Sequence, residues 1–150
     1  MSESLYVEVG GLDGLRFLAR SFYDRVVADP LLAPVFLDFT PAHAEHVAVW
    51  LAEVFGGPAE FTENLGGHHA LLQAHLGLGI TEDQRQRWLT LMADSVDEVL
   101  PGRPELAASL MDYFAWGTAI ARDVSQDPVG TDVGEPGPTP RWGRDGLQVS

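Results

Sequence analysis

Histidine is the residue type in this sequence best suited to bind a metal ion or to transfer a proton near neutral pH. The chain has five histidines, all between residues 43 and 75: His43, His46, His68, His69 and His75. Their spacing does not match the common zinc or di-iron motifs, because there is no H-E-x-x-H helix, no cysteine and no Glu-x-x-His pair. Zinc and di-iron catalysis are therefore disfavoured. The alternative is that these are core or surface histidines bonded to backbone groups.

Helical geometry indicates which of these histidines face inward. In one predicted helix, His43, Val47 and Trp50 follow each other at steps of four and three residues, which places them on one face. In a second, shorter helix, Leu71 and His75 also share a face. Two separate helices therefore each direct a histidine toward the interior.

Several kinds of catalysis need residues or motifs that this chain lacks. It has no lysine and no cysteine, which excludes Schiff-base chemistry, thiol nucleophiles, disulfides and Cys-ligated metal clusters. It also has no G-x-S-x-G nucleophile elbow and no glycine-rich phosphate-binding loop. The formal net charge of −13 repels nucleic acid and anionic bilayers, whose binding needs clustered basic residues.

Aromatic side chains with polar atoms accompany the histidines. Tyr23 and Trp88 lie on or beside the apolar stripes of two further predicted helices, and Trp50 lies on the stripe of His43. A core gains little from buried Tyr and Trp side chains, because their O–H and N–H groups need partners. Several such donors beside an internal histidine predict a mostly apolar pocket with a few directed hydrogen bonds, as in a buried cofactor site. Simple core filling is the alternative.

Helices must position these residues. Apolar residues recur at three- and four-residue steps, as in Leu15, Leu18 and Phe22, and no alternating strand pattern competes. Residues 81–84 match a capping box, and the Gly-Gly-Pro sequence at 56–58 is a strong helix stop. The spacing predicts an all-α fold with helices over residues 12–28, 41–55, 68–75, 82–100 and 104–123.

A change in composition near residue 124 divides the chain. Residues 124–150 contain five glycines and four prolines without periodic apolar positions, so we expect a flexible tail after one domain over residues 1–123. Trp142 is either incidental there or docks on the domain or on a partner. No apolar run approaches the length of a membrane span, and the first residues lack the features of a signal peptide. We therefore expect a cytoplasmic protein.

Several short motifs, in their order and spacing, resemble those of the truncated haemoglobins of group II. They are L-Y-x-x-V-G-G at residues 5–11, F-Y-D-R-V-x-A-D-P at 22–30, F-G-G-P at 55–58, G-G-H at 66–68, His75, and R-W-L-x-L-M at 87–92. The resemblance covers about residues 5–120. It implies a truncated globin fold, in which helices form a two-over-two arrangement around haem b, and this agrees with the predicted helices.

The resemblance also implies a role for each matching residue. His75 matches the proximal ligand, which binds the haem iron as a neutral imidazole. Tyr23 and Trp88 match the distal hydrogen-bond donors. His43 falls on the distal position of its helix, where much of group II has a small residue. The residues that match the walls of the haem pocket are Phe36, Val47, Trp50, Phe61, Leu71, Ile80 and Met92.

Two positions depart from the family pattern. Ala74 stands just before His75, where group II members commonly carry an arginine that pairs with a haem propionate. Residues 76–80 read Leu-Gly-Leu-Gly-Ile where a Pro-Phe pair is usual, which predicts a looser loop after His75. Neither change affects the iron ligand itself.

The resemblance implies a haem protein that binds oxygen and other small ligands at a histidine-ligated iron. Two or three directed donors, each worth roughly 1–3 kcal/mol, slow ligand escape and so favour tight binding, sensing or redox chemistry over oxygen shuttling. The enzymatic version is a dioxygenase- or peroxidase-like disposal of nitric oxide or peroxide, with electrons from an unidentified reductase. The alternative is a haem-free helical sensor or interaction module with the same fold. We expect a monomer or homodimer without nucleic-acid or membrane partners.

Overall fold

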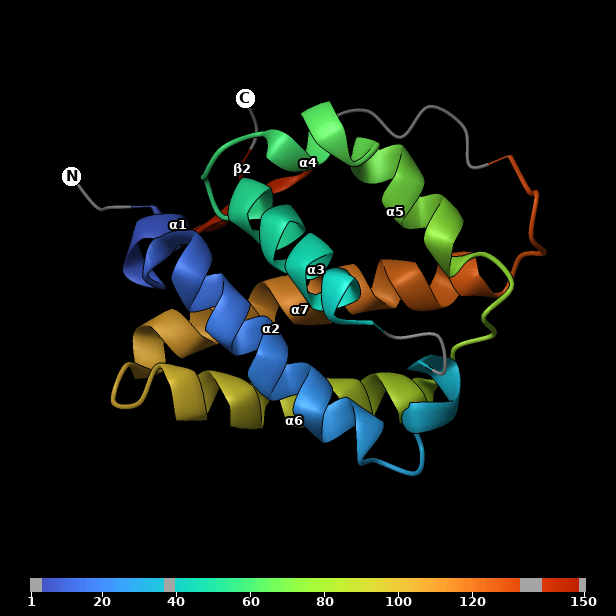
Figure 1. Cartoon of the computed structure of the whole chain (residues 1–150), viewed down its shortest axis with the longest axis horizontal. Helices are drawn as coiled ribbons and strands as arrows, with labels where there is room; N and C mark the ends of the chain where they lie inside the picture. Colours follow the sequence, from blue (N-terminus) through green and yellow to red (C-terminus); the bar gives the residue numbers. More distant parts are fainter. Residues whose placement is uncertain (1–3, 37–39, 133–138, 149–150) are drawn as a thin grey trace.

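Helices make up most of the chain in the computed structural model, which describes residues 4–36, 40–132 and 139–148 (Figure 1). The long helices are α2 (Gly11–Val27), α3 (Pro41–Val54), α6 (Glu82–Val99) and α7 (Pro104–Ser125). The short elements are α1 (Leu5–Glu8), the 3-10 helix η1 (Ala33–Phe36), α4 (Glu60–Asn64), α5 (Gly67–His75), and the strands β1 (Arg141–Gly143) and β2 (Gly146–Gln148).

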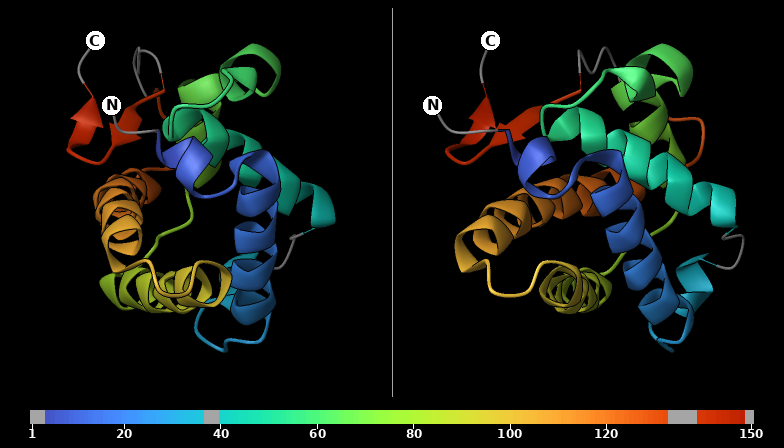
Figure 2. Two further views of the ribbon diagram at one scale, coloured as in Figure 1. Left: turned by 90° about the vertical axis from the view of Figure 1, so that its left-hand side faces the viewer. Right: turned by 60° about the vertical axis from the view of Figure 1, so that its left-hand side comes forward.

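The four long helices form two pairs. Helix α2 packs against α3, α6 packs against α7, and α2 also crosses α6 and so joins the pairs (Figures 1 and 2). Helix α5 packs against α7. This is the two-over-two arrangement that the resemblance implies. No helix in the described part of the chain is both long and apolar enough to span a membrane.

The predicted helices form at the expected places, and their ends lie within two residues of the predicted ones. Leu15 and Phe22, on the inner face of α2, are almost completely buried. At the start of α6, the Thr81 hydroxyl accepts a hydrogen bond from the Gln84 N–H, while the Gln84 side chain accepts one from the Thr81 N–H, which is the predicted capping box. After α3, Gly56 has a φ of +102°, a left-handed conformation that suits glycine and ends the helix.

The core lies where the two helix pairs meet. Its largest fully buried side chains include Phe22, Phe55 and Phe114. The ring of Phe114 packs against Phe55 and Trp88, with ring centroids 6.3 Å and 5.3 Å apart. These aromatic contacts hold α3, α6 and α7 together around the cavity described below.

The described C-terminal residues differ from the flexible tail predicted for residues 124–150. Helix α7 continues to Ser125, and β1 and β2 pair as an antiparallel hairpin. Trp142 of β1 is only 9% exposed and packs against Trp116 of α7, with ring centroids 5.5 Å apart. The physical reason is that one large aromatic side chain buries enough apolar surface to dock a short hairpin. Trp142 is therefore docked on the domain rather than incidental.

Charged side chains fasten the hairpin to the N-terminal helix. Arg144, in the hairpin turn, pairs with Glu8 of α1, and Arg103 also reaches Glu8. The hydrogen bond from Arg144 and the charges of both arginines hold the pKa of the Glu8 carboxyl below its ordinary value, although partial burial acts in the opposite direction. The hairpin is thus held by an apolar contact on α7 and by ionic contacts on α1.

Candidate functional site

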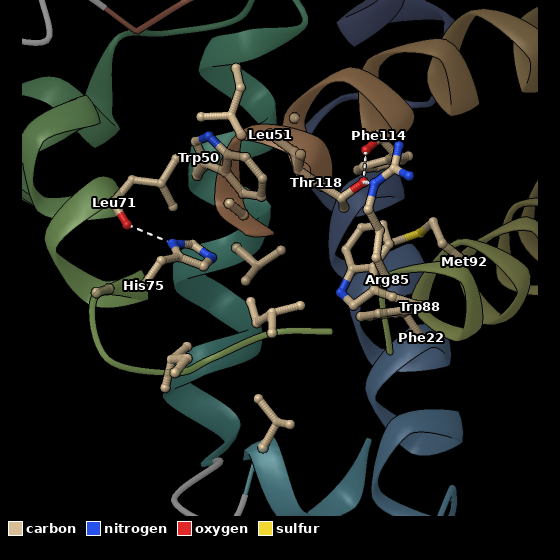
Figure 3. Close-up of a pocket in the computed structure, with 18 of the residues that line it drawn as sticks. Phe22, Trp50, Leu51, Leu71, His75, Arg85, Trp88, Met92, Phe114 and Thr118 are labelled. Atoms are coloured by element: carbon tan, nitrogen blue, oxygen red, sulfur yellow. Dashed lines mark hydrogen bonds between the residues drawn. The ribbon is translucent and has the colours of Figure 1, made fainter. Parts of the chain in front are cut away.

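A cavity of about 440 Å³ lies between α3 and α5 on one side and α2, α6 and α7 on the other (Figure 3). Most of the side chains that line it are aliphatic or aromatic. Its volume is in the range of small-molecule and cofactor sites, ~300–1,000 Å³. Because the lining comes from helices far apart in the sequence, the cavity exists only in the folded chain.

His75, the last residue of α5, directs its ring into this cavity (Figure 3). The Nδ1 atom of His75 lies 2.7 Å from the backbone carbonyl oxygen of Leu71. Because a carbonyl oxygen only accepts, Nδ1 must carry the proton, which leaves the lone pair on Nε2. Burial lowers the pKa of the ring more than the bond to Leu71 raises it, so the neutral form is favoured. His75 can therefore act as a nitrogen ligand toward the cavity.

Trp88 lies across the cavity from His75, with its indole nitrogen directed into the space between them (Figure 3). Its ring packs edge-on against Phe22, with centroids 4.7 Å apart. Tyr23 also lines the cavity and lies edge-on to Phe36, at a centroid distance of 5.7 Å. Burial raises the pKa of the Tyr23 phenol, so this side chain keeps its proton at neutral pH. The cavity lining thus includes an indole nitrogen opposite His75 and a protonated phenol side chain.

His43 lines the cavity from α3 but is itself exposed, so it stands at the edge of the cavity rather than inside it. Its ring centroid lies 6.0 Å from that of Tyr23. Partial burial of the ring, followed by the charge of His46, lowers the pKa of His43. The structure therefore brings His43 to the same end of the cavity as Tyr23.

Six of the seven side chains predicted to form the walls do line the cavity: Phe36, Val47, Trp50, Leu71, Ile80 and Met92. The seventh, Phe61, is not among the residues that line this cavity. Residues 60–64 form helix α4, which packs against α3 and α5, and Phe61 is only 7% exposed there. Its ring is thus buried outside the cavity.

The structure adds lining residues that the sequence prediction missed. Tyr113 and Thr118 belong to α7, where the apolar period of the helix could have indicated them. Arg85 of α6 is held by the Thr118 hydroxyl at 3.1 Å and by the carbonyl oxygen of Ala115 at 2.7 Å. Pro140 has no local sequence signal, because it reaches the cavity only through the docked hairpin.

Two polar atoms of the cavity wall are buried without a hydrogen-bond partner among the described residues: Nε1 of Trp50 and Nδ1 of His68. Burial lowers the pKa of His68, which favours its neutral form. An unsatisfied buried polar group costs about 1–3 kcal/mol. Both atoms are inaccessible, so they lie behind the cavity surface rather than on it.

Comparisons with known proteins agree with this architecture. The model of the bacterial-like globin family matches residues 4–117. The chain is similar to a group 2 truncated hemoglobin of Bacillus subtilis (strain 168), with 35% identity over 113 residues that cover 69% of this chain and 85% of the relative.

Solved structures give the same result. The chain is similar to the group II truncated hemoglobin from Bacillus anthracis, with a TM-score of 0.72 and 26% identity, over 90% of this chain and 98% of that chain. It is also similar to the truncated oxygen-avid haemoglobin from Bacillus subtilis, with a TM-score of 0.70 and 31% identity, over 82% of this chain and 99% of that chain. The hairpin and the end of α7 lie after residue 117, beyond the part that the family model matches.

Proposed function

The chain belongs to the bacterial-like globins and, among them, to the group II truncated haemoglobins; on this premise we propose that it binds oxygen and other small ligands at a haem iron held by His75. The observation that carries the proposal is the state of His75, a neutral ring with Nδ1 bonded to Leu71 and the other nitrogen available to the cavity. Haem held by His75 would supply an iron that binds small ligands.

The residues of the cavity fit haem in three respects. The mostly apolar lining suits the faces of the macrocycle. The neutral ring of His75, with Nδ1 bonded to Leu71, leaves Nε2 available as an iron ligand. The sequence has no cysteine for a thioether link, so the haem that we propose is of the non-covalent b type.

Support for His75 as the ligand comes from its hydrogen bond to Leu71. A ligating histidine commonly donates its other ring N–H to a backbone carbonyl, which fixes the ring orientation and raises the basicity of the ligating nitrogen. The 2.7 Å contact between Nδ1 and the Leu71 oxygen has this form. It lies within α5 and so prepares the ring before any ligand binds.

On the opposite wall, we assign Trp88 and Tyr23 to the stabilisation of a ligand that carries negative charge on its outer atom. Donors held in a low-dielectric cavity need little reorganisation to meet such a charge. His43 adds a third polar group at the edge of the cavity. The similar Bacillus subtilis haemoglobin is described as oxygen-avid, which supports slow oxygen release here.

Slow release favours sensing or chemistry on the bound ligand over oxygen transport. The enzymatic form of the proposal is the disposal of nitric oxide or peroxide. That activity needs an electron source, so its partner is a reductase. Consumption of nitric oxide or peroxide can be measured with and without an added general reductant. Repeated consumption that depends on the reductant would separate this form from simple ligand binding.

The optical spectrum of the purified protein tests the proposal. We expect a Soret band after addition of hemin, and a shift of that band when the reduced protein meets oxygen or carbon monoxide. The shift distinguishes a defined site from hemin that adheres to an apolar surface. Protein that remains colourless after hemin addition would contradict haem binding and support the haem-free alternative.

A further inference from the structure

The loop that follows His75, residues 76–80, contains two glycines, which favour a flexible backbone. Gly77 and Gly79 have φ values of +77° and +59°, and glycine loses more backbone entropy on folding than any other residue. The loop nevertheless forms part of the cavity, because Ile80 lines it. Some other part of the chain must therefore hold this loop in place.

The backbone at the end of α7 holds the loop. We call residues 125–127 the C-terminal clamp. The N–H of Gly77 donates to the carbonyl oxygen of Asp127 at 2.8 Å, and the N–H of Gly79 donates to that of Ser125 at 2.9 Å. The glycine-rich loop is thus bonded along its length to a segment that follows the part of the chain matched by the family model.

Two side chains of the clamp complete the contact at Ile80. The Ile80 N–H donates to the hydroxyl oxygen of Ser125 at 2.9 Å, and Nε2 of Gln126 donates to the Ile80 carbonyl oxygen at 2.7 Å. Ser125 is 1% exposed, and its hydroxyl donates to the Arg122 carbonyl oxygen at 2.6 Å. That buried hydroxyl therefore has a fixed donor role and a fixed acceptor role.

We propose that Ser125 and Gln126 are positioning residues for the iron ligand: by holding residues 77–80, the clamp fixes the end of α5 and with it the ring of His75. This inference rests on the proposed role of His75. The link between loop and ligand is direct, because His75 ends α5 and its carbonyl oxygen accepts a hydrogen bond from the N–H of Leu78 at 3.3 Å. Loss of the clamp frees this turn and so loosens the end of α5, which leaves the bond to Leu71 as the remaining restraint on the ring.

Two variants of the full chain test the clamp, with a third as a control. Ser125→Ala removes the acceptor of the Ile80 N–H. Gln126→Ala removes the donor to the Ile80 carbonyl oxygen, and we expect the fold to persist because this side chain is exposed. Thr131→Ala is the matched control, because its hydroxyl also donates to a nearby carbonyl oxygen, that of Pro128, outside the clamp.

Two measurements separate a positioning role from a merely structural one. Amide hydrogen exchange at Ile80 reports on the loop and needs no haem. The iron–histidine stretching band in the resonance Raman spectrum of the ferrous protein reports on the bond to His75. We expect exchange at Ile80 to accelerate about fivefold in Ser125→Ala, the effect of one ordinary hydrogen bond, and also to accelerate in Gln126→Ala. The stretching band should shift or broaden in both variants and stay unchanged in Thr131→Ala.

Each other outcome has a defined meaning. Exchange at Ile80 that is as slow in both variants as in the wild type would overturn the clamp. Faster exchange with an unchanged stretching band would overturn the positioning role, because the loop would then move without effect on the ligand. A wild-type protein that takes up no hemin would overturn the proposed function instead, while the exchange result still decides whether Ser125 holds Ile80.

Discussion

The indole ring of Trp142 packs edge-on against the phenol ring of Tyr113, with centroids 5.5 Å apart and ring planes inclined at 64°. Tyr113 is buried in α7 and lines the cavity, so the hairpin supports the cavity wall from behind. Pro140, just before β1, joins the wall directly. The docking of the hairpin and the shape of the cavity are therefore linked.

Trp142→Ala should lower the free energy of unfolding by about 3 kcal/mol, the usual cost of removing a large buried aromatic side chain. In a chain of this length the melting temperature then falls by roughly 6–12 °C. A thermal melt followed by circular dichroism measures the change. Leu147→Ala is the control, because Leu147 lies in the same hairpin and is 46% exposed. Equal melting temperatures for Trp142→Ala and the wild type would show that the hairpin does not stay docked in solution.

His75→Gly should abolish tight haem binding, because the ring that faces the cavity is removed. Added imidazole should restore part of the Soret band by occupying the space of the missing ring. Hemin titration measures both effects. His69→Gly is the control, since His69 lies on the same helix, is exposed and is not a lining residue. If His75→Gly keeps the wild-type spectrum while His68→Gly loses haem, the ligand is His68.

Oxygen release should accelerate most in Trp88→Phe, less in Tyr23→Phe and least in His43→Ala. The Trp88 indole can only donate and is directed into the cavity, whereas the Tyr23 hydroxyl can also accept and His43 is exposed at the cavity edge. Loss of one hydrogen bond to a charged ligand atom corresponds to roughly 10- to 100-fold faster release in Trp88→Phe. Stopped-flow measurement of oxygen dissociation gives the three rates.

Carbon monoxide provides the internal control for this series. Its outer atom carries little negative charge, so the loss of a donor should change its release much less. Equal acceleration of both gases in Trp88→Phe would contradict the hydrogen-bond account and leave a steric one. Easier loss of haem in all three variants, without a specific effect on oxygen, would indicate packing roles.

Glu53 of α3 is a buried carboxylate that joins α3 to α4 and to the segment before the hairpin. It is 2% exposed and accepts hydrogen bonds from the Thr62 N–H at 2.9 Å and from the Thr62 hydroxyl at 2.6 Å. Burial by itself raises the pKa of Glu53, but hydrogen bonds from Thr139 and Thr62 and the charge of Arg141 outweigh it, so the pKa lies below its ordinary value.

This shift predicts a specific pH dependence of stability. Because the pKa of Glu53 is lower in the folded state, the ionised carboxylate stabilises the fold above its ordinary pKa of 4.5, and this contribution is lost as the pH falls through the folded-state value. Glu53→Gln should therefore lower the free energy of unfolding by about 1–2 kcal/mol at pH 7. The difference from the wild type should narrow near pH 3.

Thermal melts of wild type and Glu53→Gln at both pH values measure this effect. Glu63→Gln is the control, since Glu63 is exposed on α4 and its substitution should change stability little at either pH. A difference between Glu53→Gln and the wild type that is equal at pH 7 and pH 3 would show that folding does not favour the ionised carboxylate of Glu53.

The long helices, and the faces on which His43 and His75 lie, could be predicted because both depend on local sequence. Helix α6 begins at the capping box of Thr81, and α3 ends before Gly56, which adopts the left-handed conformation expected of a helix stop. The inward faces of α3 and α5 follow from helical periodicity, so His43 and His75 could be placed on the cavity lining. The proposal that His75 is the iron ligand came from the family resemblance, not from periodicity.

The parts that could not be predicted depend on contacts between distant residues. The strands β1 and β2 have three residues each, too few for a strand pattern, and the burial of Trp142 depends on its contact with α7. Phe61 was assigned to the pocket wall by the family resemblance alone, since the five-residue helix α4 is too short for its sequence to show an inner face. The loop after His75 was expected to be loose. Most of the bonds that hold it involve backbone groups, which the side-chain pattern does not reveal.

The C-terminal clamp is synthesised after the loop that it holds. A chain leaves the ribosome from its N-terminus, so His75 and the walls formed by α2, α3 and α6 emerge before residues 125–127 do. Until those residues have been made, the glycine-rich loop lacks the partners that hold it. Because α7 and Pro140 also line the cavity, its wall and the bonds that hold the loop after His75 are completed only by residues made late in synthesis.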